Sequence, residues 1–205
     1  MANTVALIDY GAGNLHSVEN ALQAVGADVL VTANAGEVAK ADRIVLPGVG
    51  SFKACMDGLA AIPDMIGTLE NSVLSNGTPF LGICVGMQLM AQYGLEHGAH
   101  EGLGWVSGSV AALKADKTVK VPHMGWNRVE PVGDASLVEP GEAYFLHSYA
   151  FQCAQTPSSV RAVTEHGGPV VAAIQVGTAL GVQFHPEKSQ RYGLNLLSRF
   201  LEWRP

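Results

Sequence analysis

Short, unbroken apolar runs recur through the first half of the chain, and they constrain the fold more than any other feature. They are Val5–Ile8, Val29–Val31, Ile44–Leu46 and Pro79–Ile83. A run without alternating polar residues indicates a strand that is covered on both faces, as in a parallel sheet. The sequence therefore predicts strands that lie inside the molecule.

Helical periodicity separates these runs. From Leu15 to Val25, apolar residues stand three or four positions apart, and Gly26 gives a stop signal. Residues 66–73 show the same spacing, and Asn76 and Gly77 follow as the terminator. Repeated strand and helix units predict an α/β fold with a mostly parallel central sheet flanked by helices, and ligands collect at the carboxyl ends of such strands.

The second half of the chain is richer in strands. Extended segments separated by Gly, Pro and Asp turn signals are expected at Trp105–Leu113, Trp126–Val129, Tyr144–Phe151, Val160–Thr164, Val170–Gln175 and Leu180–Phe184. They predict a mixed or antiparallel extension of the sheet. Leu194, Leu197 and Leu201 indicate a final packing helix. Because no repeat, linker or low-complexity tract interrupts the chain, we expect a single domain over residues 1–205.

The composition narrows the classes of function. The chain has 205 residues, of which 48% are hydrophobic and 15% charged, against roughly 25% charged in an ordinary soluble domain. Its net charge is −6 and no basic cluster occurs, which argues against nucleic acid and anionic membrane surfaces as ligands. No apolar stretch approaches the ~18 residues of a membrane span, and no basic segment precedes the first apolar run. We expect a cytoplasmic protein.

The three cysteines are too far apart for a disulfide framework or a zinc site with C-x-x-C spacing. We expect free thiols and no structural metal. Cysteine is among the most buried residue types, and we interpret Cys55, on an expected helix face, and Cys153, after an aromatic strand, as core residues. Cys84 alone has glycines beside it at a bend.

Cys84 lies where a short apolar run meets a small-residue turn and then an amphipathic segment. The pattern Gly82-Ile-Cys-Val-Gly86 resembles a nucleophile elbow, in which flanking glycines allow a strained turn that pushes one reactive side chain above the sheet edge. At a helix N-terminus the partial positive charge favours the thiolate, the form that attacks carbonyl carbon. We therefore expect an exposed nucleophile and an enzyme.

A cysteine nucleophile requires a base, and the base requires a group that orients it. His185 ends an expected strand and continues as His185-Pro-Glu187. Pro186 restricts His185 to extended geometry, in which positions i and i+2 point to the same side. We expect Glu187 to accept a hydrogen bond from one ring nitrogen, which leaves the other to exchange a proton with Cys84.

Two glycine loops follow the strands of the first half. Pro47-Gly-Val-Gly50 could turn backbone N–H groups toward a developing oxyanion, as could the N–H of Val85 at a helix start. Gly11-Ala-Gly13 suggests a phosphate loop, but His16 stands where the third glycine of G-x-G-x-x-G is required. We therefore reject a dinucleotide site and expect no cofactor.

Three of these blocks resemble the signatures of class I, triad-type glutamine amidotransferases: Pro47-Gly-Val-Gly50, Gly82-Ile-Cys-Val-Gly-Met-Gln88 and Val182-Gln-Phe-His-Pro-Glu-Lys-Ser189. Within that class, Asp9-Tyr-Gly-Ala-Gly-Asn-Leu-His-Ser-Val18, Pro122-His-Met-Gly-Trp-Asn127 and Phe145-Leu-His-Ser-Tyr149 are similar to the glutaminase subunit of imidazole glycerol phosphate synthase, in histidine biosynthesis. The resemblance spans nearly the whole chain.

The resemblance implies roles for individual residues. Cys84 would attack the side-chain amide of L-glutamine, His185 would protonate the departing ammonia and activate water, and Glu187 would orient His185. The oxyanion would be surrounded by the backbone of Gly48, Val49 and Val85. The glutamine would be held by Gly50, Gln88, Glu96, Ser148 and Tyr149, with the Glu96 carboxylate paired to the α-ammonium group.

The resemblance also implies a partner. In the family, ammonia passes to a separate (β/α)-barrel cyclase subunit, which makes imidazole glycerol phosphate and AICAR, and the two subunits form a heterodimer. Because free ammonia is quickly protonated near neutral pH, a docked partner and a sheltered path are expected. Asn14, Met124 and Trp126 are candidates for that interface, although buried tryptophan is at least as common as interfacial tryptophan.

Two other interpretations stay open at the level of sequence. The same core could serve a synthase that makes anthranilate, guanylate or pyridoxal phosphate, or act as a cysteine peptidase; the Pro122–Asn127 block argues against these. Alternatively, the chain could be a catalytically silent subunit that only stabilises its partner. That reading requires a missing member of the triad, and all three residues are present.

Overall fold

The computed structural model describes residues 4–11, 13–117, 119–133, 137–152 and 158–205. A sheet of nine strands runs through the middle of the molecule in the order β2-β1-β3-β4-β13-β12-β11-β8-β9. Its strands are β1 (Thr4–Ile8), β2 (Asp28–Thr32), β3 (Arg43–Leu46), β4 (Phe80–Ile83), β8 (His123–Pro131), β9 (Gly141–His147), β11 (Val160–Glu165), β12 (Pro169–Val176) and β13 (Ala179–Val182). Cys153 lies outside the described residues, so its expected burial stays a prediction.

The sheet changes character along its width. From β2 to β13 all neighbouring strands are parallel, whereas β12, β11, β8 and β9 pair in antiparallel fashion. The four apolar runs of the first half all form strands in the parallel part, and three of them are wholly or almost wholly buried. The fourth, in β2, lies at the edge of the sheet with Leu30 and Val31 exposed, so the expectation that it is covered on both faces is wrong. The predicted α/β fold, with an antiparallel extension in the second half, is therefore confirmed.

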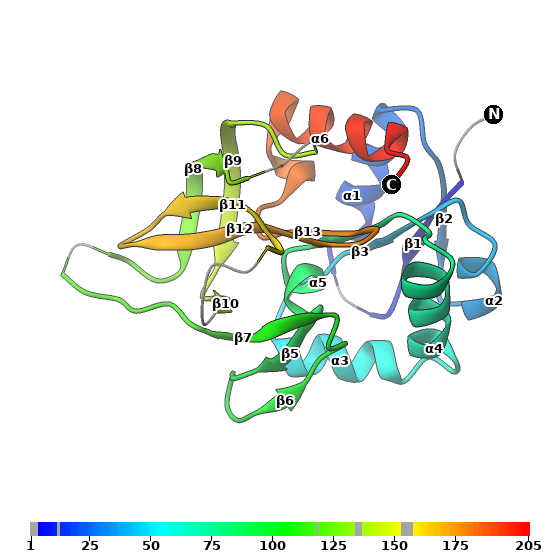
Figure 1. Ribbon diagram of the computed structural model, residues 1–205, viewed down its shortest axis with the longest axis horizontal. Coiled ribbons are helices and arrows are strands. Elements are labelled where there is room, and N and C mark those ends of the chain that lie inside the picture. The colour runs from blue at the N-terminus through cyan, green and yellow to red at the C-terminus, as the bar shows by residue number, and fades with distance from the viewer. Residues whose placement is uncertain (1–3, 12, 118, 134–136, 153–157) are drawn as a thin grey trace.

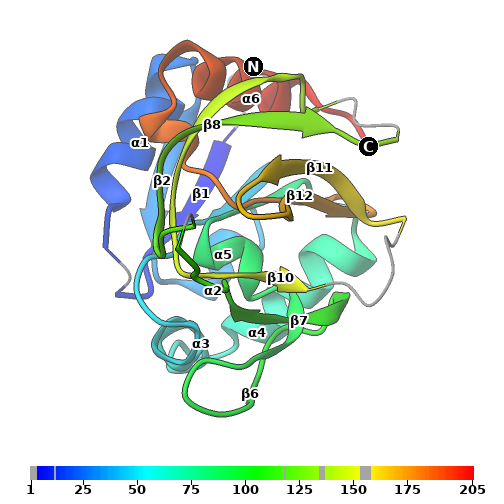
Figure 2. The ribbon, with the colours of Figure 1, turned by 90° about the vertical axis from the view of Figure 1, so that its left-hand side faces the viewer.

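Helices cover both faces of the sheet (Figures 1 and 2). On one face lie α1 (Leu15–Ala24), the 3-10 helix η2 (Pro186–Lys188) and α6 (Gln190–Glu202); the other carries α2 (Ala35–Val38), α3 (Phe52–Ala60), α4 (Met65–Leu69), the π-helix η1 (Glu70–Ser75) and α5 (Val85–Gln88). The helix expected over residues 66–73 is thus an α-helix that continues as a π-helix. It ends where the sequence signals: the N–H of Asn76 donates to Asn71 O at 2.9 Å, and Gly77 has a φ of +73°.

A second sheet of four strands lies on the side of α3. Its order is β10-β7-β5-β6, with β5 (Ala91–Gly94), β6 (His100–Glu101), β7 (Val106–Ala112) and β10 (Tyr149–Gln152). The expectation that residues 105–113 extend the central sheet is therefore wrong, as is the single strand expected over residues 144–151. That segment bends at Ser148, whose carbonyl accepts from the N–H of Leu113 at 2.9 Å. As a result β9 pairs with β8 in one sheet, and β10 pairs with β7 in the other.

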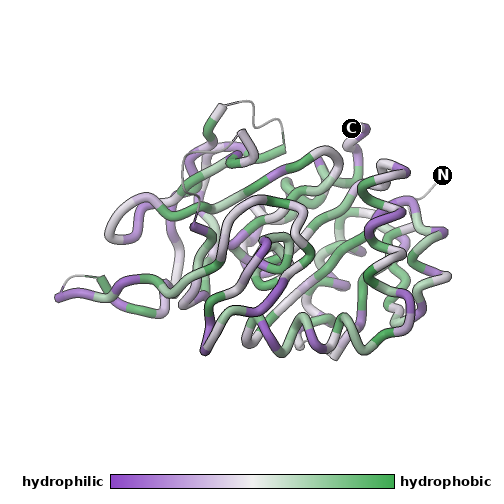
Figure 3. Tube along the Cα trace, turned by 60° about the horizontal axis from the view of Figure 1, so that its bottom comes forward, coloured by the Kyte–Doolittle hydropathy of each residue, from purple (hydrophilic) through white to green (hydrophobic). Residues whose placement is uncertain are grey.

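The core lies between the central sheet and its two helical layers, and the trace is hydrophobic mainly along the inner strands (Figure 3). The charged side chain of Arg43 is buried there and donates from Nη2 to the carbonyls of Leu201 and Trp203, at 2.6 and 2.9 Å. A cation at the last carbonyls of α6 is favourable because these groups lack helical partners. No helix among the described residues is long and apolar enough to cross a membrane.

Candidate functional site

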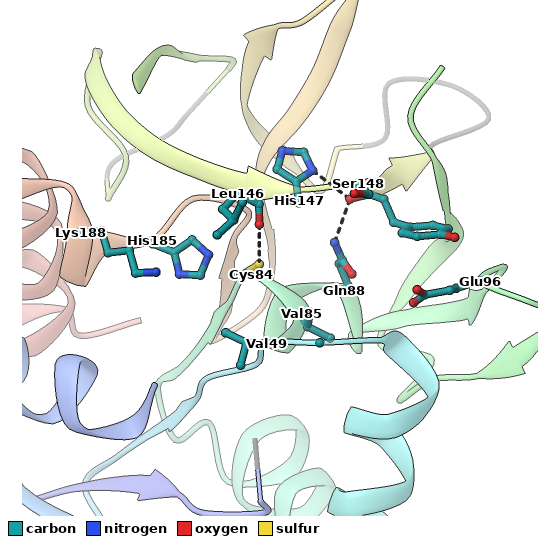
Figure 4. Close-up of a pocket in the computed structure, with 12 residues that line it drawn as sticks. Val49, Cys84, Val85, Gln88, Glu96, Leu146, His147, Ser148, His185 and Lys188 are labelled. Carbon is teal, nitrogen blue, oxygen red and sulfur yellow. Dashed lines mark hydrogen bonds between the residues drawn. The ribbon is translucent and has the colours of Figure 1, made fainter. Parts of the chain in front are cut away.

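The carboxyl ends of three adjacent parallel strands meet at one edge of the central sheet. β3 leads into the loop Pro47–Gly50, β4 leads into Cys84, and β13 leads toward His185. These segments border a cavity of about 150 Å³ (Figure 4). The cavity is lined by Val49, Gly50, Cys84, Val85, Gln88, Glu96, Leu146, His147, Ser148, Tyr149, His185 and Lys188.

Cys84 occupies a strained turn between β4 and α5. Its φ of +53° and ψ of −110° lie outside the regions that residues with a Cβ normally adopt. The flanking glycines are required by close backbone approach: a Cβ on Gly86 would lie 1.9 Å from Leu46 O, and one on Gly82 would lie 2.7 Å from Gly86 O. The predicted elbow geometry is therefore present.

The expectation that Cys84 is exposed is wrong. The residue is 3% exposed, because strand β9 passes over it (Figure 4). Its Sγ lies 3.8 Å from Leu146 O, to which the thiol donates, and 3.7 Å from Nε2 of Gln183. The sulfur is thus reached through the cavity and not from the open surface. Cys55 is buried as expected, and both cysteines are free thiols.

His185 and Glu187 form a buried pair beside Cys84. Nδ1 of His185 lies 2.9 Å from Oε1 of Glu187. His185 is extended, with φ −102° and ψ 99°, but the chain then enters η2, so the extended geometry expected through Glu187 is wrong. A 3-10 turn that begins at Pro186 brings the two side chains together. With Nδ1 engaged, Nε2 is the nitrogen left to face the thiol.

Asn14 binds the same carboxylate oxygen as His185. Its Nδ2 donates to Oε1 of Glu187 at 2.6 Å, from a backbone with φ +71° just before α1. Oε2 of Glu187 is buried and has no hydrogen-bond partner in the described part of the chain. Asn14, expected at a partner interface, thus contacts the candidate triad directly.

The pKa of His185 reflects these contacts. Burial opposes the charged imidazolium, but the hydrogen bonds to Cys84 and Glu187 and the negative charges that these groups can carry outweigh it, and the pKa of His185 rises to about 9. The imidazole therefore readily holds a proton taken from the sulfur. This is the electrostatic arrangement that a cysteine nucleophile requires.

Two side-chain hydrogen bonds hold the loop Pro47–Gly50 in place. Tyr10 donates its hydroxyl to Pro47 O at 2.5 Å, and Cys55 donates its thiol to Val49 O at 3.4 Å. The intervening Gly48 O accepts from the N–H of Val85 at 3.3 Å. In this conformation the N–H of Val85, an expected oxyanion donor, is engaged by a carbonyl of the neighbouring loop. An oxyanion site at Val85 therefore requires this peptide to turn.

The five residues expected to hold a substrate all line the cavity. Glu96 is anchored there through Oε2, which accepts from the N–H of Phe52 at 3.0 Å. Gln88 donates through Nε2 to Tyr149 O at 2.9 Å and to Oε1 of Gln183 at 3.0 Å. Both amide hydrogens of Gln88 are thus in use, which leaves its carbonyl oxygen for a ligand.

Four residues of the site were missed by sequence reasoning: Leu146, His147, Gln183 and Lys188. Gln183 had a recognisable signal, since it is the polar residue in the apolar run Gly181–Phe184. Lys188 directly follows Glu187. Leu146 and His147 enter through the bend of β9, which local patterns do not indicate. No cluster of His, Cys, Asp or Glu suited to a metal ion occurs among the described residues.

The other two interface candidates lie outside the cavity. Met124 is 64% exposed and Trp126 is 48% exposed, both on the outer face of β8. Leu146, paired with Met124 across β8 and β9, is also exposed and reaches the cavity rim. An apolar stripe therefore connects the outer face of the β8–β9 hairpin to the site.

Comparison with known proteins places this geometry in a family. The family model described as "Glutamine amidotransferase class-I" matches residues 6–203. The protein named imidazole glycerol phosphate synthase subunit HisH from Zymomonas mobilis is 59% identical over 209 residues, with 100% of this chain and 98% of the relative covered. The HisH subunit from Rhodospirillum rubrum is 48% identical, with 98% and 99% covered.

Solved structures agree at the level of fold. A glutamine amidotransferase crystal structure superposes with a TM-score of 0.75 at 16% identity and 97% coverage of both chains. The structure of PurLQS from Thermotoga maritima gives 0.72 at 15% identity, with 98% of both chains covered. With a buried cysteine at a glycine-flanked elbow, an adjoining His–Glu pair and a match over nearly its whole length, the chain belongs to the class-I glutamine amidotransferase family.

Proposed function

We propose that this protein is the glutaminase subunit of an imidazole glycerol phosphate synthase, which hydrolyses L-glutamine to glutamate and ammonia for histidine biosynthesis. The observation that carries the proposal is that Cys84 and His185 line one cavity together with Glu96, while Glu187 binds His185 from behind. The HisH names of the full-length relatives support the choice of synthase over the anthranilate, guanylate and pyridoxal phosphate alternatives.

In the proposed reaction, His185 accepts the proton of Cys84 at Nε2, and Sγ attacks the side-chain amide carbon of glutamine. The tetrahedral intermediate collapses when His185 returns the proton to nitrogen, so that the C–N bond breaks, ammonia leaves and a thioester remains. Water, deprotonated by His185, then attacks the thioester; the C–S bond breaks and glutamate and the thiol are released. Glu187 keeps Nδ1 engaged throughout, which holds the ring in one orientation.

The proposed partner is a (β/α)-barrel cyclase that receives the ammonia and forms imidazole glycerol phosphate and AICAR. The apolar stripe of Met124, Trp126 and Leu146 is a suitable surface for it, because the stripe ends at the cavity that would release ammonia. The Gly48 carbonyl engages the N–H of Val85, so a turned loop would be needed for full activity. We infer that docking favours the turned loop and raises glutamine turnover.

Replacement of Cys84 by Ala tests the function directly. Glutamate release, measured with the purified complex of this chain and the cyclase, should fall to background, because the thioester cannot form. Cyclase product formed from added ammonium salt should stay at the wild-type level, since that route bypasses the thiol. That assay controls for the cyclase alone, and co-elution of the variant with the cyclase in size-exclusion chromatography shows that the variant is folded and docked.

Substantial glutamine hydrolysis by Cys84→Ala would contradict the proposed nucleophile. Loss of co-elution with the cyclase together with glutaminase activity would instead indicate a failure of folding or docking. Equal glutaminase rates with and without the cyclase would remove the proposed coupling and leave the hydrolysis intact. The three results are therefore distinguishable.

A further inference from the structure

We propose that Gln183 is a further catalytic residue: its side-chain amide donates a hydrogen bond to Cys84 Sγ and stabilises the thiolate. The proposal rests on the proposed function only in that Cys84 is taken as the nucleophile. Nε2 of Gln183 lies 3.7 Å from Sγ, and the residue is wholly buried. Gln183 therefore touches the reacting atom.

Strand register brings the two residues together. In the parallel pair of β4 and β13, Val182 lies opposite Ile83, and the N–H of Cys84 donates to Val182 O at 2.8 Å. The next residues along both strands are Cys84 and Gln183, which consequently project to the same side of the sheet edge. The contact is a consequence of the central sheet and not of a mobile loop.

A chain of hydrogen bonds determines which end of the Gln183 amide faces the sulfur. Tyr149 O is a backbone carbonyl and can only accept, so the atom of Gln88 at 2.9 Å from it must be the nitrogen. That nitrogen also donates to Gln183 at 3.0 Å, so the atom of Gln183 that faces it must be the oxygen. The N–H₂ end of Gln183 is then the end directed at Sγ.

The surroundings of Sγ favour opposite protonation states. Leu146 O, at 3.8 Å, accepts from the thiol and therefore favours the protonated form. The Gln183 amide is a donor and favours the thiolate, because hydrogen bonds to charged acceptors are stronger than those to neutral ones. When the proton passes from Sγ to Nε2 of His185, the Leu146 contact is lost and the Gln183 contact strengthens. Gln183 thus compensates the charge left on sulfur in a site from which water is largely excluded.

Replacement of Gln183 by Met tests the donor. Methionine has similar length and no N–H, and Gln88 keeps Tyr149 O as the acceptor for one of its two amide hydrogens, while the other loses Oε1 of Gln183. Alkylation of Cys84 by iodoacetamide, followed peptide by peptide with mass spectrometry across a range of pH, reports the thiolate population without any glutamine. We expect alkylation near neutral pH to slow about tenfold and its midpoint to move to higher pH, as for loss of a hydrogen bond to a charged group.

Three further variants keep the test decisive. Leu180→Val, a buried change on the same strand away from the sulfur, should lower thermal stability and leave the alkylation profile unmoved. Gln183→Asn retains an amide but is one methylene shorter, so that it cannot bridge Gln88 and Sγ; it should show an intermediate slowing. Cys84→Ser identifies the adduct by its absence.

A folded Gln183→Met that alkylates with the wild-type pH profile would overturn the proposal, and if that variant does not fold, the same result with Gln183→Asn would do so. If Leu180→Val shifts the alkylation profile as much as Gln183→Met does, the proposal is also overturned, because a loss of stability alone would then explain the shift. The experiment measures the reactivity of the sulfur and uses no glutamine. Its outcome therefore does not depend on whether the chain hydrolyses glutamine.

Discussion

At the scale of single residues, the candidate triad depends on charge that is held inside the protein. Glu187 accepts from His185 and Asn14 through the same oxygen, at 2.9 and 2.6 Å. An ionised carboxylate fits this pattern, because it offers several lone pairs and both neighbours donate. The raised pKa of His185, about 9, is the expected consequence of its contacts with Cys84 and this carboxylate.

Replacement of Glu187 by Gln should alter the pH dependence of stability. His185 has a folded pKa of about 9, above its ordinary value of 6.5, so its contribution is complete below pH 6.5 and is lost as the pH rises toward 9. Without the carboxylate charge the folded pKa drops. We expect the loss of unfolding free energy over that window to shrink by about 1–2 kcal/mol, measured by urea denaturation at both ends.

Asn14→Ala is the matched comparison, because it removes a hydrogen bond and keeps the charge. It should lower stability at every pH by about 1 kcal/mol and leave the slope near that of wild type. If the curves of Glu187→Gln and wild type run parallel between pH 6.5 and 9, the pair does not set the protonation of His185.

Sequence reasoning found the residues of the site that sit in local patterns. Cys84 is marked by its flanking glycines, and Glu187 is only two positions from His185. Gln183 was missed because its contact with Cys84 depends on the register between two strands about a hundred residues apart in sequence. The burial of Cys84 was missed for the same kind of reason, since a residue far along the chain, Leu146, covers it.

At the scale of elements, a chain of side chains links β8 and β9 to the start of β10. Nδ1 of His123 lies 3.0 Å from Nε2 of His147, whose Nδ1 lies 2.9 Å from Tyr149 O. Because that carbonyl only accepts, His147 must donate from Nδ1 and accept at Nε2, and His123 must donate from Nδ1. Asn127 then donates to Nε2 of His123 at 3.0 Å. Both histidines are neutral in this arrangement.

Acid should therefore destabilise this region. Burial, with smaller effects from His147 and His166, lowers the pKa of His123 to about 3. Burial also lowers the pKa of His147 to about 4, against the effect of its bond to Tyr149. The unfolded histidines take up protons below pH 6.5 while the folded ones do not, so stability is complete above pH 6.5 and is lost as the pH falls toward 4.

His123→Gln should reduce that acid sensitivity. With one titrating group fewer, the slope of unfolding free energy between pH 6.5 and 4 should fall by up to about 1.4 kcal/mol per pH unit, while stability near pH 8 drops by about 1–2 kcal/mol through the lost hydrogen bond. Urea denaturation at several pH values measures both. His16→Gln, at a highly exposed histidine, is the control and should leave the curve unchanged. An unaltered slope in His123→Gln would refute the neutral-pair assignment.

Strands and helices were predictable where a single hydrophobic pattern covers the whole element. The four apolar runs of the parallel strands and the amphipathic segments of α1 and α6 were found from spacing alone. The second sheet was not, because β5 and β6 are short and partly exposed, with no apolar run to mark them. Nor was the bend at Ser148, since the apolar pattern from Tyr144 to Phe151 continues through it while its hydrogen-bond partners change from β8 to β7.

At the scale of the whole molecule, the cavity and the outer face of the β8–β9 hairpin lie at the same side. Met124, Trp126 and Leu146 make that face apolar, and Leu146 also lines the cavity. The scarcity of charge in the chain agrees with a surface that is covered in an assembly. A partner seated on this face would close the route from the site to solvent.

Trp126→Asp should weaken binding of the cyclase by about thirtyfold or more, as expected for a charge placed at a central aromatic contact. Trp126 is 48% exposed and packs edge-on against Tyr144, so the folded chain should lose little stability. Calorimetric titration with the cyclase measures the affinity. Leu74→Asp is the control: Leu74 is 52% exposed, on η1 after α4 and away from the hairpin (Figure 1), and its change should not affect binding. Equal weakening by both variants, or none by Trp126→Asp, would place the partner on another surface.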